Sequence, residues 1–265
     1  MTPLDTLRQY CQALRLPTAA AVLEESLALA QREAWPPETL LLHFLEQELS
    51  GRTQRRITRM VQAAHLPPGK TRETLDAQRL PLRTQRQLPE LCTGHLVERA
   101  DNLLLFGLPG TGKTHLAAAL GYEWIQRNLS VLFVPTYQLV DSLLRAKRDY
   151  ALEPELRRLD RFQVVIVDDL GYIQQSRAEM EVLFTFLAER YERRSVVITS
   201  NLVFSEWNQI FKDPLTTAAA IDRVVHHSLI IEFGRDIPSL RAEEAARRNG
   251  LALPAVPAPT TPAAP

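Results

Sequence analysis

One eight-residue stretch limits what this chain can fold into more than any other. Residues 107–114 read GLPGTGKT and match the phosphate-binding pattern G-x-x-x-x-G-K-[ST] at every fixed position. An apolar run over residues 102–106 precedes the stretch and a helix-favouring run over residues 115–126 follows it. The motif therefore has the strand, loop and helix that it requires. This setting disfavours the alternative of a glycine-rich turn with a chance lysine, and it predicts an α/β nucleotide-binding domain.

The residue types in this loop suit a polyphosphate. Its glycines allow the backbone to curve until its amides face phosphate oxygens, and the positive end of the following helix adds to that field. We expect Lys113 to be a surface-facing charge that reaches the β- and γ-phosphates, and Thr114 to place its hydroxyl on Mg²⁺. The expected nucleotide-binding residues are Gly107, Leu108, Pro109, Gly110, Thr111, Gly112, Lys113, Thr114 and His115.

A second apolar run supplies two carboxylates. Residues 163–169 read QVVIVDD, which predicts a buried parallel strand with acids at its carboxyl end, where open α/β sheets bind ligands. Asp168 is the expected Mg²⁺ ligand, directly or through water. Asp169 is the candidate base that orients the attacking water. An acid without a catalytic role is the alternative for Asp169, because aspartate reaches less far than glutamate.

Later polar residues leave more alternatives open. Asn201 follows another apolar strand, where it could hold the lytic water or contact the γ-phosphate, or could simply cap a loop. Arg223 could act in trans on a neighbour's nucleotide or only pair with Asp222. His226 and His227 are adjacent and should diverge on a helix, so we expect structural roles and no shared metal.

The chain divides by pattern into four parts. Residues 1–66 have helical periodicity and no strand signals, which predicts a small all-helical domain with its leucine stripes as the core. Residues 67–95 carry four prolines and are expected to form an extended connector. Residues 96–241 alternate strand and helix signals, which predicts a central parallel sheet flanked by helices. Residues 242–265 are rich in proline and alanine and are expected to be a disordered tail.

Charge is distributed unevenly although the formal net charge is zero. Residues 52–86 hold nine lysines or arginines and only two acids. Four of these arginines have i, i+3, i+4 and i+7 spacing, which places one basic ridge on a helix face. Such a ridge could neutralise DNA phosphates or could be an ordinary solvated face, and charge alone favours neither. The candidate DNA-binding residues are Arg52, Arg55, Arg56 and Arg59.

Cysteine use and hydropathy indicate the compartment. Cys11 and Cys92 have neither metal-site nor disulfide-framework spacing, and free thiols suit a reducing cytoplasm. The first residues carry an early acid and no continuous apolar core, unlike a secretory signal. No run approaches the ~20 apolar residues of a membrane helix. We expect a soluble cytoplasmic protein without membrane contact.

Four stretches in fixed order resemble the IstB-like ATP-binding proteins: GLPGTGKTHLAAALG, VVIVDDLGYI, LAERYERRSVVITSNLVFSEWNQIF and DPLTTAAAIDRVVHH. This family comprises helper ATPases of insertion-sequence transposition, which are similar to DnaC-type helicase loaders and belong to the AAA+ class. The resemblance implies that residues 107–114 are the Walker A loop and that Asp168 and Asp169 are the Walker B pair. It also implies that Asn201 is the sensor-1 residue and Arg223 the arginine finger.

The resemblance further implies a function. Such a protein binds ATP and Mg²⁺, forms a homo-oligomer with ATP at subunit interfaces, binds double-stranded DNA with little sequence preference and assists a cognate transposase. Its ATPase activity is expected to be stimulated by DNA or by the transposase. Alternatives are a DnaC-like replicative helicase loader, a small-substrate P-loop kinase, or a binding module that barely hydrolyses ATP. The chain departs from many AAA+ proteins by having Asp169 in place of glutamate and a short stretch after Phe233, in which Arg241 is the candidate sensor-2 residue.

Overall fold

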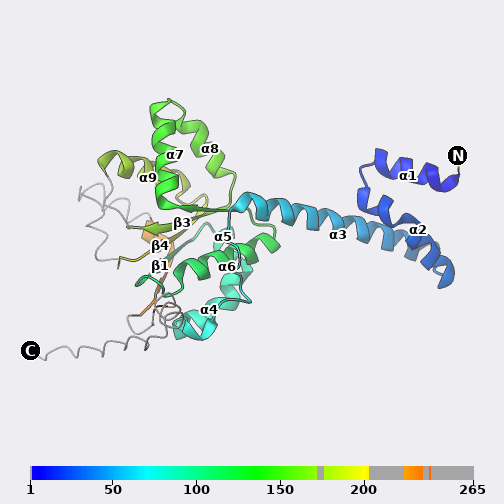
Figure 1. The fold of residues 1–265 in the computed structure, drawn as a ribbon, viewed down its shortest axis with the longest axis horizontal. Helices are drawn as coiled ribbons and strands as arrows, with labels where there is room; N and C mark the ends of the chain where they lie inside the picture. Colours follow the sequence, from blue (N-terminus) through cyan, green and yellow to red (C-terminus); the bar gives the residue numbers. More distant parts are fainter. Residues whose placement is uncertain (1, 172–175, 203–223, 235–238, 240–265) are drawn as a thin grey trace, which may run out of the picture. The chain divides into compact units, whose positions relative to one another are not determined.

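The computed structural model describes residues 2–171, 176–202, 224–234 and 239 (Figure 1). The chain divides into two compact units, Met1–Gln62 and Ala63–Pro265, and each is described by itself. The tail expected at 242–265 lies outside the described residues. No helix in the described ranges is both long enough and apolar enough to cross a membrane.

The first unit is helical. Thr2 and Asp5 cap the first helix reciprocally, and a proline occupies the first turn of each of the first two helices, where its missing amide hydrogen costs nothing. Cys11, Ala19 and Leu23 are buried in its small core. The helices are α1 (Pro3–Ala13), α2 (Pro17–Arg32) and α3 (Pro37–Ala64).

The leucine stripe of α3 does not form the predicted core. Leu41, Leu45 and Leu49 are 60%, 48% and 64% exposed, whereas Glu48 and Ile57 are buried. The prediction was wrong because helical spacing identifies an apolar face but not whether another helix covers it. In this unit α3 meets α2 through a face that contains a buried carboxylate.

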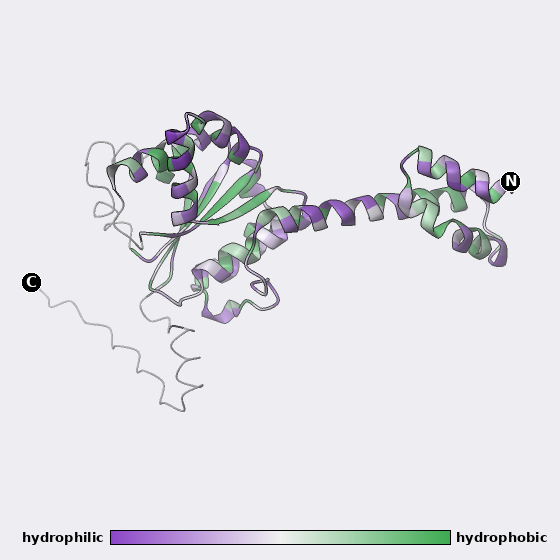
Figure 2. Ribbon diagram, turned by 45° about the horizontal axis from the view of Figure 1, so that its top comes forward, coloured by the Kyte–Doolittle hydropathy of each residue, from purple (hydrophilic) through white to green (hydrophobic). Residues whose placement is uncertain are grey.

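The second unit is built on a five-stranded parallel sheet with the order β2-β3-β4-β1-β5. Each predicted strand is present, and the strands are mostly apolar, as their colour in Figure 2 shows. Their residues are largely buried in β1, β2, β3 and β4. The strands are β1 (Asn102–Phe106), β2 (Val131–Pro135), β3 (Val164–Leu170), β4 (Ser195–Ser200) and β5 (Ser228–Glu232).

Helices cover both faces of this sheet (Figure 1). On one face α7, α8 and α9 bury a cluster that includes Leu104, Val165 and Ile198 from the strands. On the other face lie α4 and α6. Ser176 and Glu179 form a capping box at the start of α9. The helices are α4 (Leu82–Thr93), α5 (His95–Glu98), α6 (Lys113–Gln126), α7 (Thr136–Arg148), α8 (Leu152–Asp160) and α9 (Arg177–Arg190).

The expected connector is partly helical. It contains the short 3₁₀ helix η1 (Ala77–Arg79) and the twelve-residue α4. Pro81 precedes α4 and Pro89 lies inside it. The prediction that these prolines keep the segment extended was therefore wrong for α4. Leu88 and Leu91 are buried, and the Leu91 carbonyl accepts a hydrogen bond from Trp124 Nε1 of α6 at 2.8 Å. Packing against α6 therefore outweighs the local proline signals.

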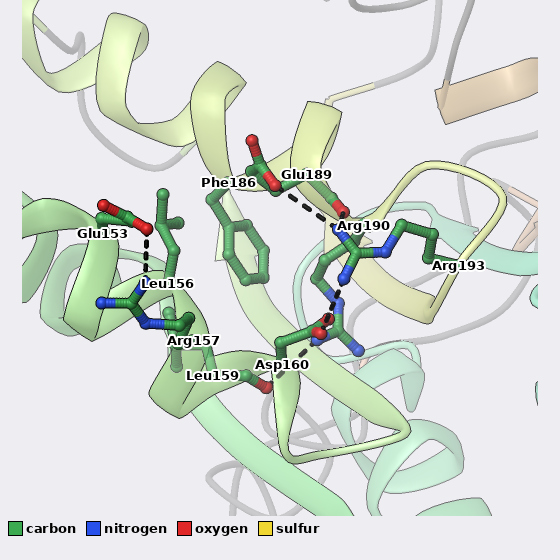
Figure 3. A pocket seen from close by; sticks show the side chains of 9 residues that line it. All are labelled: Glu153, Leu156, Arg157, Leu159, Asp160, Phe186, Glu189, Arg190 and Arg193. Atoms are coloured by element: carbon green, nitrogen blue, oxygen red, sulfur yellow. Dashed lines mark hydrogen bonds and ion pairs between the residues drawn. The ribbon is translucent and has the colours of Figure 1, made fainter.

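A buried arginine fastens the amino-terminal ends of β3 and β4. The Arg190 guanidinium, 2% exposed, donates to the carbonyls of Leu159, Phe162, Gln163 and Ser195 at 3.0 to 3.2 Å. It lines a pocket between α8 and α9 together with several exposed charged residues (Figure 3). Burial lowers the pKa of Arg190 to about 9. Its contacts join α8, α9 and two strands, which makes it a structural side chain.

Candidate nucleotide-binding site

The carboxyl ends of three neighbouring strands bring the predicted site residues together. Phe106 of β1 pairs with Ser200 of β4, and Ser200 pairs with Leu170 of β3. The Gly107 amide also donates to the Ser200 carbonyl at 3.2 Å. The glycine-rich loop after β1, Asn201 after β4 and the acids of β3 consequently lie along one edge of the sheet, where α/β folds bind ligands.

The backbone of the loop requires glycine at residues 107 and 110. Gly107 and Gly110 have φ angles of +148° and +82°, which side chains rarely adopt. A Cβ on Gly107 would lie 2.9 Å from the Phe233 carbonyl oxygen, and one on Gly110 would lie 2.0 Å from Ser239 Oγ. The loop is therefore closely backed by the chain after β5, and it can keep this curve only with glycine.

Lys113 lies inside the curve of the loop and not on the surface. It is 5% exposed, and its Nζ donates to the Gly107 and Leu108 carbonyls at 2.7 and 2.9 Å. The prediction of a surface-facing charge was wrong, because the start of α6 turns this side chain back into the loop. A buried ammonium needs such acceptors, and these carbonyls hold it where a phosphate would enter.

The two acids of β3 are separated by a bulge. The register of β3 against β4 shifts between Val167 and Leu170, and Asp169 has a φ of +59°. Asp168 is half-buried and Asp169 is exposed. A bulge re-aims side chains at the end of a strand, so the two carboxylates occupy different surroundings.

Thr199 of β4 connects these acids, and the sequence reasoning missed it. Its hydroxyl donates to Asp168 Oδ1 at 2.6 Å and accepts from the Asp169 amide at 2.9 Å. Burial raises the pKa of Asp168, and hydrogen bonds from Thr199 and Thr114 oppose that rise. The signal was available, because a threonine inside an apolar strand next to β3 needs a polar partner.

Asn201 follows β4 at the same edge of the sheet. The Oδ1 atom of Asn201 is buried and accepts no hydrogen bond from the described residues. An amide oxygen in this state is suited to a water or ligand donor at the sheet edge. Arg223, predicted to be an arginine finger, lies outside the described residues.

His115 contacts the chain before the sheet instead of the loop. Its Nε2 is 3.1 Å from both the Thr71 carbonyl oxygen and Thr74 Oγ1. Burial lowers the pKa of this imidazole. The segment 66–74 makes a second contact with α6, because the Tyr122 hydroxyl donates to the Pro67 carbonyl at 3.4 Å. We therefore assign His115 to holding this segment, which differs from the predicted contact with nucleotide.

The same segment brings another cation near the site. Lys70 is adjacent to Thr71, whose carbonyl contacts His115 of the phosphate-loop helix. Burial raises the pKa of Asp168, and the charge of Lys70 is among the effects that lower it. Lys70 thus lies within electrostatic range of the Asp168 carboxylate, and no motif in the sequence indicated this.

The predicted basic ridge of α3 is divided in the structure. Arg52 and Arg55 both pair with Glu48, at 2.9 and 3.1 Å. Arg52 also donates to the Arg15 carbonyl at 2.8 Å. Burial opposes ionisation of Glu48, but hydrogen bonds from Arg52 and the amides of residues 18 and 19 hold its pKa below the ordinary value. Two of the four ridge arginines therefore stabilise the first unit.

Solved structures with a similar fold define the class of the second unit. DnaI aligns with a TM-score of 0.53 and 21% identity, over 64% of this chain and 96% of that one. AMPPCP-bound DnaA from Aquifex aeolicus aligns with a TM-score of 0.52 and 17% identity, over 72% of this chain and 58% of that one. These likenesses concern the fold alone. With the parallel sheet and the P-loop at its edge, they show that the second unit has the predicted AAA+ fold.

Sequence comparison gives the family. The family described as IstB-like ATP binding protein matches residues 9–246. An insertion sequence ATP-binding protein of Sinorhizobium fredii is 43% identical over 237 residues, which cover 89% of this chain and 80% of that protein. The IS21 ATP-binding protein of Pseudomonas aeruginosa is 36% identical, over 80% of each chain. The chain belongs to the IstB-like ATP-binding proteins, and the predicted resemblance is confirmed.

Proposed function

We propose that this chain is a Mg²⁺-dependent ATPase that converts ATP and water to ADP and phosphate, and that it assists an insertion-sequence transposase on DNA. The observation that carries the proposal is the meeting of the P-loop, the Asp168–Thr114 contact and Asn201 at one sheet edge. Membership of a family whose relatives are insertion-sequence proteins favours transposition over helicase loading.

The donor set at the sheet edge fits Mg²⁺. This ion prefers hard oxygen ligands, and the Thr114 hydroxyl and the Asp168 carboxylate are neighbours. When bound, Mg²⁺ neutralises phosphate charge during transfer. In this proposal residues 107–113 bind the phosphates through the loop, and the Lys113 ammonium exchanges a carbonyl for a phosphate oxygen.

Asp169 and Asn201 are proposed to handle the attacking water. Asp169 carries an exposed carboxylate on a backbone fixed by Thr199, so it can accept a proton from a water near its Oδ atoms. The free acceptor on Asn201 Oδ1 can orient that water. Because Asp168 is committed to Thr199 and Thr114, the two acids take separate roles, metal side and base.

Oligomerisation and DNA contact complete the proposal. We place Arg223 in trans at a neighbour's nucleotide, as the motif resemblance implies, and place Arg56 and Arg59 on DNA phosphates. Arg56 and Arg59 form no ion pair in the described part of the chain, unlike Arg52 and Arg55. ATP at subunit interfaces would join several such weak contacts along one duplex.

ATP hydrolysis measured with and without duplex DNA tests the proposal. Asp169→Asn is the sharpest variant, because asparagine tolerates the left-handed backbone at this position while losing the base. We expect hydrolysis to fall by about 10² to 10⁴-fold with nucleotide affinity retained. Lys113→Ala should abolish the thermal shift caused by nucleotide.

The outcomes separate the alternatives. Duplex DNA should raise the wild-type rate, whereas a small-substrate kinase would ignore it. If the Asp169→Asn variant hydrolyses ATP at the wild-type rate, Asp169 is not the base. A Lys113→Ala protein that still gains stability from nucleotide would contradict the assignment of the loop.

A further inference from the structure

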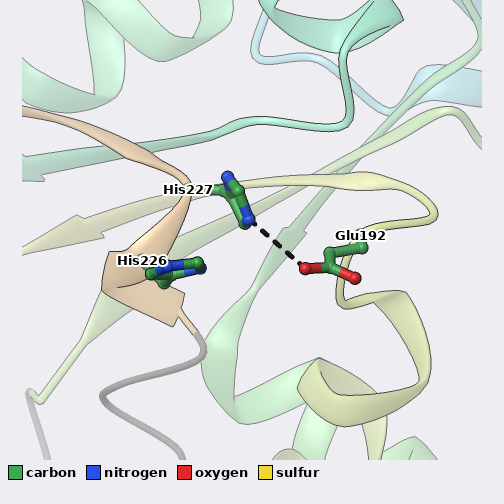
Figure 4. Close-up of side chains that lie close together, drawn as sticks. All are labelled: Glu192, His226 and His227. Atoms are coloured by element: carbon green, nitrogen blue, oxygen red, sulfur yellow. Dashed lines mark ion pairs between the residues drawn. The ribbon is translucent and has the colours of Figure 1, made fainter.

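Three side chains with metal-ligating atoms gather at the start of β5, away from the P-loop. One ligand atom from each of Glu192, His226 and His227 lies within 4.8 Å of the other two (Figure 4). His227 Nε2 is 3.3 Å from a Glu192 carboxylate oxygen, and the two imidazole rings are 4.3 Å apart between centroids. The prediction that adjacent histidines diverge was wrong, because His226 ends a helical turn and His227 begins the turn into β5.

One residue, Asn102, joins the backbone segments that flank these ligands. Asn102 at the start of β1 accepts from the Val196 amide at 2.9 Å and donates to the Val224 carbonyl at 3.2 Å. Its own amide donates to the His227 carbonyl at 2.7 Å. Asn102 therefore ties the start of β4, just after the Glu192 turn, to the segment with both histidines. Preorganised backbones lower the ordering cost of binding an ion.

The donor chemistry selects a divalent transition metal. Two imidazoles and one carboxylate are a common zinc ligand set, which leaves a fourth position open. Tetrahedral zinc with bonds of about 2.0 to 2.2 Å keeps its ligand atoms roughly 3.4 Å apart. The His227–Glu192 separation of 3.3 Å is close to this value, and a ligand atom of His226 lies within 4.8 Å of both partners.

A tyrosine hydroxyl contacts one of the two imidazoles. The Tyr191 hydroxyl lies 3.2 Å from His226 Nδ1, which leaves Nε2 as the ligand atom of that ring. A hydrogen bond of this kind orients metal-bound imidazoles in many sites. His226 and Glu192 are exposed and His227 is half-buried, so an ion can reach the cluster from solvent.

We propose that Glu192, His226 and His227 form a zinc site that clasps the turn after α9 to the entry of β5. The clasp would fix the backbone three residues after Arg223. The proposal does not depend on ATP hydrolysis, and it gives the segment after Arg223 a metal-dependent anchor to the rest of the second unit.

Zinc titration of the full chain without a histidine tag tests this site. Competition with a chromophoric chelator should show about one Zn²⁺ per chain, and Co²⁺ should give the visible absorption of tetrahedral coordination. His226→Gln and His227→Gln should each weaken binding by at least 10-fold and together abolish it. Tyr191→Phe should weaken it by about 10-fold, the lower end of the loss caused by outer-shell partners.

The controls keep a folding defect apart from a lost ligand. His65→Gln changes an exposed histidine of the same unit outside the cluster and should leave zinc affinity unchanged. The double variant should melt like the wild type without metal but lose the zinc-induced rise in melting temperature. Wild-type protein that binds no zinc at micromolar concentration, or a double variant that binds it equally well, would overturn the proposal.

Discussion

Each unit of the molecule has a buried charged side chain that joins several of its elements, Glu48 in the first unit and Arg190 in the second. These two charges are satisfied in opposite ways. Glu48 in the first unit accepts from the Thr18 and Ala19 amides and from two arginines that reach into solvent. Arg190 in the second unit donates to four main-chain carbonyls. A buried carboxylate can thus recruit surface arginines, whereas the hydrogen bonds of the buried guanidinium within the described residues go to main-chain carbonyls.

This difference teaches how to sort the arginines of the chain. An arginine on an exposed helix face can still be structural when a buried acid lies one or two turns away, as with Arg52 and Arg55. Substitution of the charged residues that hold a unit together, such as Glu48 and Arg190, should change folding strongly and ligand binding weakly. The reverse should hold for the charges we assign to ligands, and the following variants test that separation.

Arg190→Leu should have the largest effect on folding. It removes the donor from four carbonyl oxygens in two buried and two partly buried hydrogen bonds. We expect the free energy of unfolding of the second unit to fall by about 3 to 5 kcal/mol. Urea denaturation followed by circular dichroism measures the change. Arg157→Leu is the matched control, because Arg157 lines the same pocket but forms an exposed pair with Glu153 (Figure 3). An equal loss of unfolding free energy in both variants would show that the main-chain hydrogen bonds of Arg190 do not stabilise the second unit.

Glu48→Gln should destabilise the first unit by about 2 kcal/mol, because hydrogen bonds to a charged acceptor are lost. Hydrogen exchange in peptides from α1 to α3 locates the effect. The Glu48 pKa lies below its ordinary value, so its contribution is present at neutral pH and disappears as acid protonates it. The variant should therefore lose less stability on acidification than the wild type. Glu24→Gln, which breaks an exposed pair with Arg8, is the control and should change little.

Thr199→Val should affect the site more than the fold. Loss of the hydroxyl frees the Asp168 carboxylate to rotate, and we expect hydrolysis to fall by about 10-fold, as for outer-shell partners of metal ligands. Thr199→Ser keeps the hydroxyl and should retain most of the activity. A Thr199→Val rate equal to that of the wild type would show that Asp168 does not need this orientation.

The sequence was most informative where chemistry requires a residue type at every position. The P-loop at 107–114 and the acid-ended strand at 163–169 predicted both the parallel sheet and the edge at which Asn201 meets them. Each strand was identifiable from a short apolar run next to a helical one. The side-chain contacts within this edge were not, because Thr199 and Lys70 belong to segments distant in the chain.

Periodicity alone was less informative. Helical spacing predicted a buried stripe through Leu45 and an arginine ridge through Arg52, but neither prediction could include the position of Glu48 between them. The prolines before residue 95 concealed α4, because its stability comes from α6. Adjacent histidines were read with helix geometry although the helix ends between them. In each case the deciding contact is tertiary.

The double variant Arg56→Ala, Arg59→Ala should change folding least. It is the most direct test of the difference between charges that stabilise the fold and charges that bind ligands. If these two arginines contact phosphates, the slope of log affinity against log salt for duplex DNA should flatten by about 2, since each contact contributes about 0.9. The matched pair is Arg52→Ala with Arg55→Ala, which should lower the stability of the first unit through Glu48. Binding is therefore compared at a temperature where both variants are folded, as judged by hydrogen exchange in α1 to α3. A flattened slope in the Arg56/Arg59 variant alone would show that these two arginines bind DNA and that Arg52 and Arg55 stabilise the fold. An unchanged slope in the Arg56/Arg59 variant would show that the ridge is an ordinary solvated face.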